Sequence, residues 1–278
     1  MTKKYLELVG ISKGIDVSKW QGDINWEKVK KDGIEFAMIK ESHGKKSTAN
    51  IDAKFKENVA GAKNNGIYVG TYHYSYADNE NDAVLEAQFC LENIAGLQLE
   101  YPVVFDIEDK EQHKLSTDQR TDICFAFCKE IEKAGYYAMV YSNVDWFTNY
   151  LNKDYISKNF DIWLAQWNVS KPAFDCGIWQ NSDIGVVSGI STNVDLDVSY
   201  KDYPQIIKNK GLNGFSKSIS NLKIGDKVKV KNAIQYDGKP FTVYFPDYEI
   251  IEIKNDRVVI GKDGVVTSAV DINNLTKS

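Results

Sequence analysis

The feature that most constrains the fold is an alternation of apolar, β-rich runs with helical patterns along the first 200 residues. The runs recur about every 24–35 residues, which is the spacing of parallel strand–helix–strand units. Each run is short and rich in β-branched or aromatic residues, as buried strands are. We expect strands over 14–20, 36–42, 68–76, 102–109, 137–143, 161–167, 177–182 and 193–200.

Helical patterns separate the first six runs. Ser116 and Gln119 fit a capping box, and Gly66 and Gly135 stand just past helix ends, where a left-handed residue is favoured. Eight strands with five helices predict an irregular, TIM-like α/β barrel whose last three strands lack helices. The competing fold is an open doubly wound sheet, which is disfavoured because no glycine-rich phosphate loop follows any strand. The expected helices cover roughly 25–32, 52–65, 79–95, 117–134 and 143–151.

The pattern of apolar and polar residues changes after Tyr200. We expect a catalytic domain over residues 1–203, a linker over 204–217 that lacks periodicity, and a small all-β domain over 218–278. The last domain contains no His and no Cys, and its acids are scattered in turns, so it is expected to bind rather than catalyse. Its expected strands are 227–234, 241–245, 248–253, 257–261 and 265–270, separated by turn signals.

Composition excludes several classes of protein. The net charge of −5 gives no support for nucleic-acid binding. No apolar run approaches the roughly 18 residues that a membrane span needs, so membrane insertion is not expected. The N-terminus reads MTKKYLELVGISKG, in which Glu7 and Gly10 interrupt the apolar stretch, so it does not fit a signal peptide. We therefore expect cytoplasmic synthesis, with another component releasing the protein if it acts outside the cell.

The segment VVFDIED, residues 103–109, places acids at the end of a buried strand. An unpaired buried carboxylate is costly enough that it tends to take up a proton, so acids at the end of a buried strand indicate a specific role. In a barrel of parallel strands, catalytic residues lie at the carboxyl ends of the strands. Asp106 and Glu108 are two residues apart, so both side chains should enter one pocket with Cβ atoms roughly 6–7 Å apart. Two such acids with separated pKa values are what glycoside hydrolysis uses.

Other strand ends point into the same expected mouth. They combine acids and aromatic rings without a cluster of His, which suits a neutral sugar polymer. The candidates are Asp16, Tyr74, Tyr76, Tyr141, Ser142, Asn143, Gln166, Trp167, Asp195 and Asp197.

Structural explanations compete with this interpretation. Strands often end in acids that cap helices or bind metals, and Asp16, Asp106, Glu108 and Asp195 could together ligate Mg²⁺. Each aromatic residue taken singly is as consistent with core packing as with ligand contact. We interpret His73 as a barrel-wall residue and His43 and His113 as loop residues, without metal-ligand spacing. No cofactor and no bound metal are expected.

These motifs resemble the glycoside hydrolase family 25 lysozymes of the Chalaropsis type, a family that includes many phage endolysins. The opening signature is GIDVSKWQGDINW at 14–26, and GIEFAMIK, GIYVGTYHYSY, VVFDIED and WLAQW follow in the family's order. NVDLDVSY at 193–200 resembles the closing motif. The resemblance covers about residues 10–203.

The resemblance implies a flattened barrel and an N-acetylmuramidase, which cleaves the β-1,4 bond from N-acetylmuramic acid to N-acetylglucosamine in peptidoglycan. By motif match, Glu108 is the general acid/base and Asp106 the second carboxylate, with Asp16 and Asp195 supporting them and Tyr74 near the reacting sugar. It also implies retention of configuration. Either Asp106 attacks the sugar or the substrate's own acetamide does so, with Asp106 orienting it.

Two departures from the family pattern occur. The chain reads Lys40-Glu41-Ser42-His43-Gly44 where the family often reads Lys-Ala-Thr-Glu-Gly, so no role is transferred to that acid. The closing Asp-x-Asn is here Asp195-Leu196-Asp197, and we favour Asp195 as the residue that faces the pocket.

The C-terminal domain resembles bacterial SH3-like cell-wall-binding modules. Together with the first domain it predicts a phage endolysin for a Gram-positive host, released through a pore-forming holin. Exposed strand edges would allow two C-terminal domains to pair into a homo-oligomer. The rival functions are a catalytically inactive carbohydrate-binding barrel and a metal-dependent hydrolase.

Overall fold

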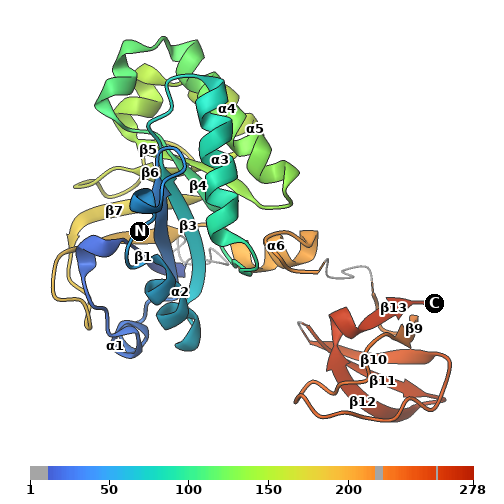
Figure 1. Ribbon diagram of the computed structural model, residues 1–278. Helices are drawn as coiled ribbons and strands as arrows, with labels where there is room; N and C mark the ends of the chain where they lie inside the picture. Colours follow the sequence, from blue (N-terminus) through green and yellow to red (C-terminus); the bar gives the residue numbers. More distant parts are fainter. Residues whose placement is uncertain (1–11, 217–221, 255) are drawn as a thin grey trace, which may run out of the picture. The chain divides into compact units, whose positions relative to one another are not determined.

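The structure, a computed structural model, describes residues 12–216, 222–254 and 256–278 (Figure 1). The features predicted at the extreme N-terminus therefore lie outside the described residues. The chain divides after Ile207 into two compact units, which are described separately.

A closed barrel of eight strands forms the first unit (Figure 1). Strands β1 to β7 are parallel to their neighbours, whereas β8 is antiparallel to both β7 and β1. The predicted barrel is confirmed and the open doubly wound sheet is wrong; the reversal of β8 was not predicted. The strands are β1 (Ser12–Val17), β2 (Phe36–His43), β3 (Tyr68–Tyr74), β4 (Val103–Asp106), β5 (Ala138–Asn143), β6 (Asp161–Ala165), β7 (Ile178–Gly185) and β8 (Val194–Ser199).

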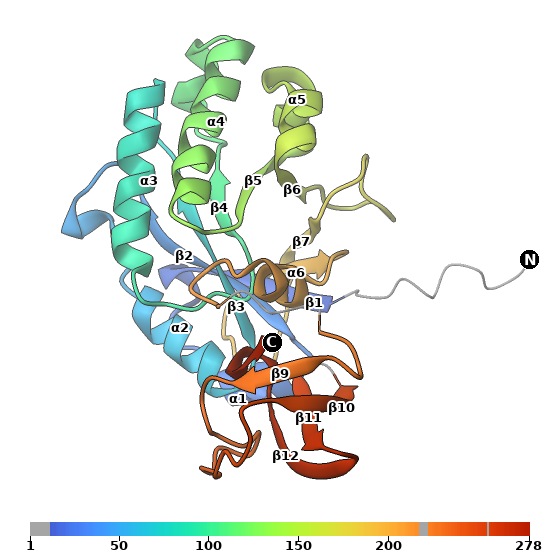
Figure 2. The same ribbon diagram turned by 90° about the vertical axis from the view of Figure 1, so that its right-hand side faces the viewer.

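Helices α3, α4 and α5 stand next to one another outside the strands (Figure 2). Helix α3 packs against α4 and β2, and α4 packs against β4 and β5. The helix expected over 143–151 is present as a short helical segment with a π-helical turn over Trp146–Tyr150. Asn152 then accepts a hydrogen bond from the backbone of Tyr155 and caps a separate helix. The helices are α1 (Trp26–Lys31), α2 (Phe55–Asn64), α3 (Glu80–Ile94), α4 (Thr117–Lys133), α5 (Lys153–Asn159) and α6 (Tyr203–Lys210).

The predicted helix ends are confirmed. Ser116 and Gln119 exchange both hydrogen bonds of a capping box at the start of α4. Gly66 and Gly135 have φ angles of 68° and 84°, which residues with a Cβ adopt only with strain. Cys90, Cys124 and Cys128 are buried free thiols. The core of the first unit fills the space between the barrel wall and the helices, with Ile15, Val69, Phe105, Phe127 and Leu164 among its fully buried members.

A buried ionic network joins β2 and β3 to α3. His73 is fully buried, with Nδ1 2.7 Å from Glu41 Oε1 and Nε2 3.5 Å from Glu86 Oε2. Asn93 donates to the other oxygen of Glu41. Glu41 therefore lies on the helix side of the barrel wall, away from the mouth, and His73 is a wall residue, as predicted from the sequence.

The network should make the stability of the barrel depend on pH. Burial alone would lower the pKa of His73, but the hydrogen bonds and charges of Glu41 and Glu86 outweigh it and raise the pKa to about 9. The value in the unfolded chain is about 6.5. The folded state therefore holds an extra proton between these two values, and the resulting stabilisation, roughly 3 kcal/mol, is complete below about pH 6.5 and lost as pH rises through about 9.

We expect the free energy of unfolding to fall more steeply from pH 6.5 to 9.5 in the wild type than in a His73→Gln variant. Urea unfolding followed by tryptophan fluorescence measures this for the barrel alone, because all 6 Trp precede residue 180. Parallel pH curves for the two proteins would contradict a charged His73.

The linker predicted from residue 204 begins inside helix α6. Tyr203 and Ile207 are buried on one face of this helix, and both belong to the first unit, which ends at Ile207 within the helix. The sequence pattern missed it because only these two apolar positions, four residues apart, mark the buried face.

The second unit is a single antiparallel sheet with the strand order β12-β11-β10-β9-β13. The strand expected over 241–245 is wrong: the Tyr248 hydroxyl, not a neighbouring strand, accepts hydrogen bonds from the backbone of Tyr244 and Phe245. The sheet covers its own small core, which includes Val228, Tyr248 and Ile260. Its strands are β9 (Lys227–Val230), β10 (Tyr248–Lys254), β11 (Arg257–Lys262), β12 (Val265–Asp271) and β13 (Leu275–Lys277).

Among the described residues, no helix combines the length and the apolar character that crossing a bilayer requires.

Candidate active site

A pocket of about 180 Å³ opens at the carboxyl ends of the parallel strands. The pocket is lined by the four acids predicted from the sequence, which lie on or directly after three different strands. Asp106 ends β4 and Glu108 follows it, Asp16 is the penultimate residue of β1, and Asp195 is near the start of the reversed β8. The lining residues are Asp16, Lys40, Tyr72, Tyr74, Asp106, Glu108, Tyr141, Trp163, Gln180 and Asp195.

Asp106 and Glu108 form the central acid pair. Asp106 is 4% exposed, and its Oδ1 has no hydrogen-bond partner among the described residues. Glu108 is hydrogen-bonded to Asn143 at the end of β5. A buried carboxylate oxygen without a protein partner is rare and calls for a ligand or a proton. Asp106 Oδ1 is therefore a buried atom that a ligand or a proton would satisfy.

The pKa values of Asp106 and Glu108 differ from those of ordinary surface acids. Burial, followed by repulsion from Glu108, raises the pKa of Asp106 well above its usual range. Burial also raises the pKa of Glu108, and the nearby Lys40 ammonium opposes the shift in both groups. Because Asp106 and Glu108 share one pocket and a negative charge on Glu108 raises the pKa of Asp106, ionisation of one acid disfavours ionisation of the other.

Asp16 lies beside β8, which carries two further acids. Asp16 is opposite Asp195 in the β1–β8 register, and Asp197 is two residues further from the mouth, opposite Gly14. Asp197 is 2% exposed and accepts a hydrogen bond from the Trp163 indole at 2.8 Å. Because β8 runs in reverse, its first acid reaches the mouth, so Asp195 lines the pocket and Asp197 supports it from below.

The predicted aromatic residues differ in their distance from the acids. Tyr74 and Tyr141 line the pocket, and Tyr76, 53% exposed, stands at the rim with its ring 5.2 Å from that of Tyr74. Trp167 is also at the rim, 41% exposed. Gln166 does not line the pocket: its side chain accepts a hydrogen bond from the backbone of Ala173 instead.

Four lining residues were missed from the sequence: Lys40, Tyr72, Trp163 and Gln180. The alternation of side chains between the two faces of a strand could have identified two of them. Tyr72 is two residues before Tyr74 on β3, so they share a face, and Trp163 on β6 is four residues before Trp167, which follows the strand at an even spacing. Lys40 and Gln180 carry no such signal, because each is the first polar residue on an otherwise apolar strand face.

No group of three or more His, Cys, Asp or Glu side chains within residues 12–216, 222–254 and 256–278 is arranged to hold a metal ion.

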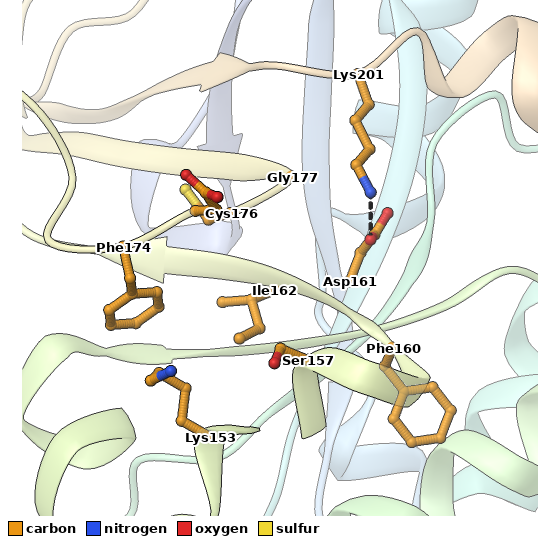
Figure 3. Close-up of a pocket in the computed structure, with 10 residues that line it drawn as sticks. Lys153, Ser157, Phe160, Asp161, Ile162, Phe174, Cys176, Gly177 and Lys201 are labelled. Atoms are coloured by element: carbon orange, nitrogen blue, oxygen red, sulfur yellow. Dashed lines mark hydrogen bonds and ion pairs between the residues drawn. The ribbon is translucent and has the colours of Figure 1, made fainter. Parts of the chain in front are cut away.

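A larger cavity, about 460 Å³, lies at the opposite end of the barrel (Figure 3). Asp161 at the start of β6, Gly177 before β7 and Lys201 after β8 line it, which places it at the amino ends of the parallel strands. Its acid Asp161 is already paired with Lys201 at 2.5 Å and accepts hydrogen bonds from two tyrosine hydroxyls. The cavity therefore lacks a free acid pair, and the smaller pocket is the better catalytic candidate.

The sequence pattern of Glycosyl hydrolases family 25 matches residues 15–190, which span the strands that carry three of the four pocket acids and end just before the strand of Asp195. The chain belongs to glycosyl hydrolases family 25. The family assignment from the sequence motifs is thereby confirmed.

Relatives within family 25 include proteins named as lysozymes. The autolytic lysozyme of Clostridium acetobutylicum is 34% identical over 187 residues, which cover 66% of this chain and 55% of that protein. Lysozyme M1 of Streptomyces globisporus is 33% identical over 196 residues, which cover 66% of this chain and 65% of that protein. The structure of the CTP1L endolysin superposes with a TM-score of 0.63 at 29% identity, over 71% of this chain and 70% of the endolysin.

The chain thus matches about half to two thirds of the length of these curated lysozymes.

Proposed function

We propose that the protein is an N-acetylmuramidase that hydrolyses the β-1,4 bond between N-acetylmuramic acid and N-acetylglucosamine in peptidoglycan. The proposal rests on one observation. A single aromatic-lined pocket at the barrel mouth contains Asp106, Glu108, Asp16 and Asp195. Glycosidases use a pair of carboxyl groups of this kind to break the glycosidic bond. An inactive carbohydrate-binding barrel would have no need to bury four acids together, which destabilises the fold.

Glu108 acts as the general acid/base. In its protonated form it donates to the glycosidic oxygen as the bond to the leaving sugar breaks, and as a carboxylate it then removes a proton from the attacking water. The raised pKa of Glu108, due mainly to burial, favours the acid form that this step requires.

Asp106 acts on the other side of the reacting carbon. In one pathway its carboxylate attacks the anomeric carbon; in the other its unpartnered Oδ1 accepts a hydrogen bond from the substrate acetamide, whose oxygen then attacks. Both pathways retain the configuration of the sugar.

Digestion of purified peptidoglycan tests the activity. The new reducing ends should be N-acetylmuramic acid, identified by borohydride reduction and mass spectrometry, and EDTA should leave the rate unchanged because carboxyls and water suffice. Reducing ends of N-acetylglucosamine, or no new reducing ends, would overturn the proposal. Loss of activity in EDTA that added Mg²⁺ or Zn²⁺ restores would favour the metal-dependent hydrolase.

We further propose that the second unit is an SH3-like module that binds the wall polymer of a Gram-positive host, in a phage endolysin that is made in the host cytoplasm and reaches the wall through a holin. Support comes from the two-unit organisation and from the likeness of the barrel to an endolysin. If the second units of two chains paired, the resulting dimer would bind the wall polymer at two points.

Removing the second unit should weaken lysis of whole cells by about 10²-fold or more and hardly change hydrolysis of short soluble wall fragments. A bound module raises the effective concentration of the barrel at its polymer without adding contacts to the active site. The fragment should end at residue 216, so that it keeps helix α6 with its buried Tyr203 and Ile207.

Rates of the full chain and the fragment on both substrates decide the outcome. Equal losses on cells and on soluble fragments would mean that the second unit stabilises the barrel rather than targets it.

A further inference from the structure

Gln180 connects three side chains of the pocket. Its Nε2 donates to Asp16 Oδ2 at 2.7 Å, and its Oε1 lies 3.2 Å from both the Tyr141 hydroxyl and Trp167 Nε1. Gln180 is 3% exposed, so water does not substitute for these partners. An indole N–H can only donate, so the amide oxygen must face Trp167 and the amide hydrogens must face Asp16.

The orientation of this amide determines where Asp16 can carry a proton. Because Asp16 Oδ2 already accepts from Gln180, the other oxygen, Oδ1, is the preferred site for a proton on Asp16. Burial, followed by repulsion from Asp197 and Asp195, raises the pKa of Asp16 well above its usual range, which favours the protonated form. Burial raises the pKa of Asp195 as well, and its hydrogen bond with Asp16 opposes that rise, as a donor to a carboxylate does. In this arrangement Asp16 donates and Asp195, which lines the pocket, accepts.

The same amide is tied to the rim of the pocket. Trp167 is 41% exposed, yet its only hydrogen-bonding group is directed inward to Gln180. What Trp167 can offer a sugar is therefore the ring itself. A continuous path of hydrogen bonds runs from this ring through Gln180 to Asp16 and Asp195.

We propose that Gln180 is a positioning residue that holds the Asp16 proton on Oδ1, directed to Asp195, and that Trp167 keeps the Gln180 amide in the orientation this requires. The inference rests on the proposed muramidase function for its kinetic consequences. Gln180 touches no reacting atom; it acts through the charge of Asp195 in the pocket.

Gln180→Met removes both hydrogen-bonding ends of the side chain at similar volume. We expect kcat on soluble peptidoglycan fragments to fall about tenfold with KM changed less than about twofold, because a hydrogen bond to an acid is lost and Asp16 Oδ2 becomes able to take the proton. Gln180→Glu keeps an oxygen toward Trp167 but can donate to Asp16 only when it is protonated. Its activity should therefore approach the wild-type value at acid pH and fall as pH rises, a profile that a merely structural role would not produce.

Trp167→Phe keeps a ring at the rim and loses only the indole N–H. It should lower kcat a few-fold, and it should cause no additional loss in the Gln180→Met background, because both changes release the same amide. Trp179→Phe is the matched control: its indole donates to the Gln166 backbone carbonyl at 2.8 Å, beside Trp167, without reaching Gln180. This control should leave the pH dependence of kcat unchanged.

A readout without substrate separates this inference from the proposed function. Carbon-13 NMR titration of the Asp16 and Asp195 carboxyls, assigned with the Asp16→Asn and Asp195→Asn proteins, should show a changed titration of both groups in Gln180→Met. If the wild type cleaves no peptidoglycan, the function fails while the titration still tests Gln180. Unchanged carboxyl titration in folded Gln180→Met, or independent effects of Gln180→Met and Trp167→Phe, would overturn the inference.

Discussion

A Glu108→Gln protein is expected to hydrolyse peptidoglycan about 10²–10⁴-fold more slowly than the wild type while remaining folded. The amide has nearly the shape of the carboxyl but cannot give a proton to the leaving oxygen. Because the acid form of Glu108 is the one required, wild-type activity should decline as pH rises through the raised pKa of this group, whose main cause is burial. The variant should lose that alkaline decline together with its rate.

The measurement is kcat on soluble wall fragments from pH 4 to 9, with thermal unfolding to check the fold. Glu111→Gln makes the same chemical change at an exposed position just beyond the pocket and should behave as wild type. Near-normal kcat in a folded Glu108→Gln protein would remove Glu108 from its role.

An Asp106→Asn protein is expected to lose about 10²–10³-fold in kcat, the usual effect of removing a group that stabilises charge in a transition state. Its stability should not fall, because the buried carboxyl has an unpartnered oxygen and its negative charge is repelled by Glu108. A loss of activity that accompanies unfolding would point to a structural role instead. Asp122→Asn, on the exposed face of α4, is the matched control.

A companion experiment distinguishes the two pathways for Asp106. In Asp106→Ala, azide should restore turnover with an azido sugar as product if the carboxylate attacks the anomeric carbon. If the acetamide is the nucleophile, azide should have no effect, since the attacking group is still present in the substrate.

Much of the site follows from two periodicities in the sequence. The strand spacing predicted parallel strands, and the position of Asp106 and Glu108 at the end of one of them predicted that both acids lie at the barrel mouth. The reversal of β8 could not be predicted, because a strand pattern carries no direction, and without it the choice between Asp195 and Asp197 had no geometric basis. Lys40 and Gln180 were missed for a different reason: their environment is made by strands distant in the sequence.

Antiparallel pairing of β8 with β1 also sets where the barrel can be joined to other proteins. Ser12 and Ser199 are register partners, so the chain enters and leaves the barrel at the same end, the one opposite the substrate pocket. A fusion made after α6 would therefore begin away from the mouth, whatever module follows. Recombination at this point could therefore replace the module that follows without rebuilding the catalytic pocket.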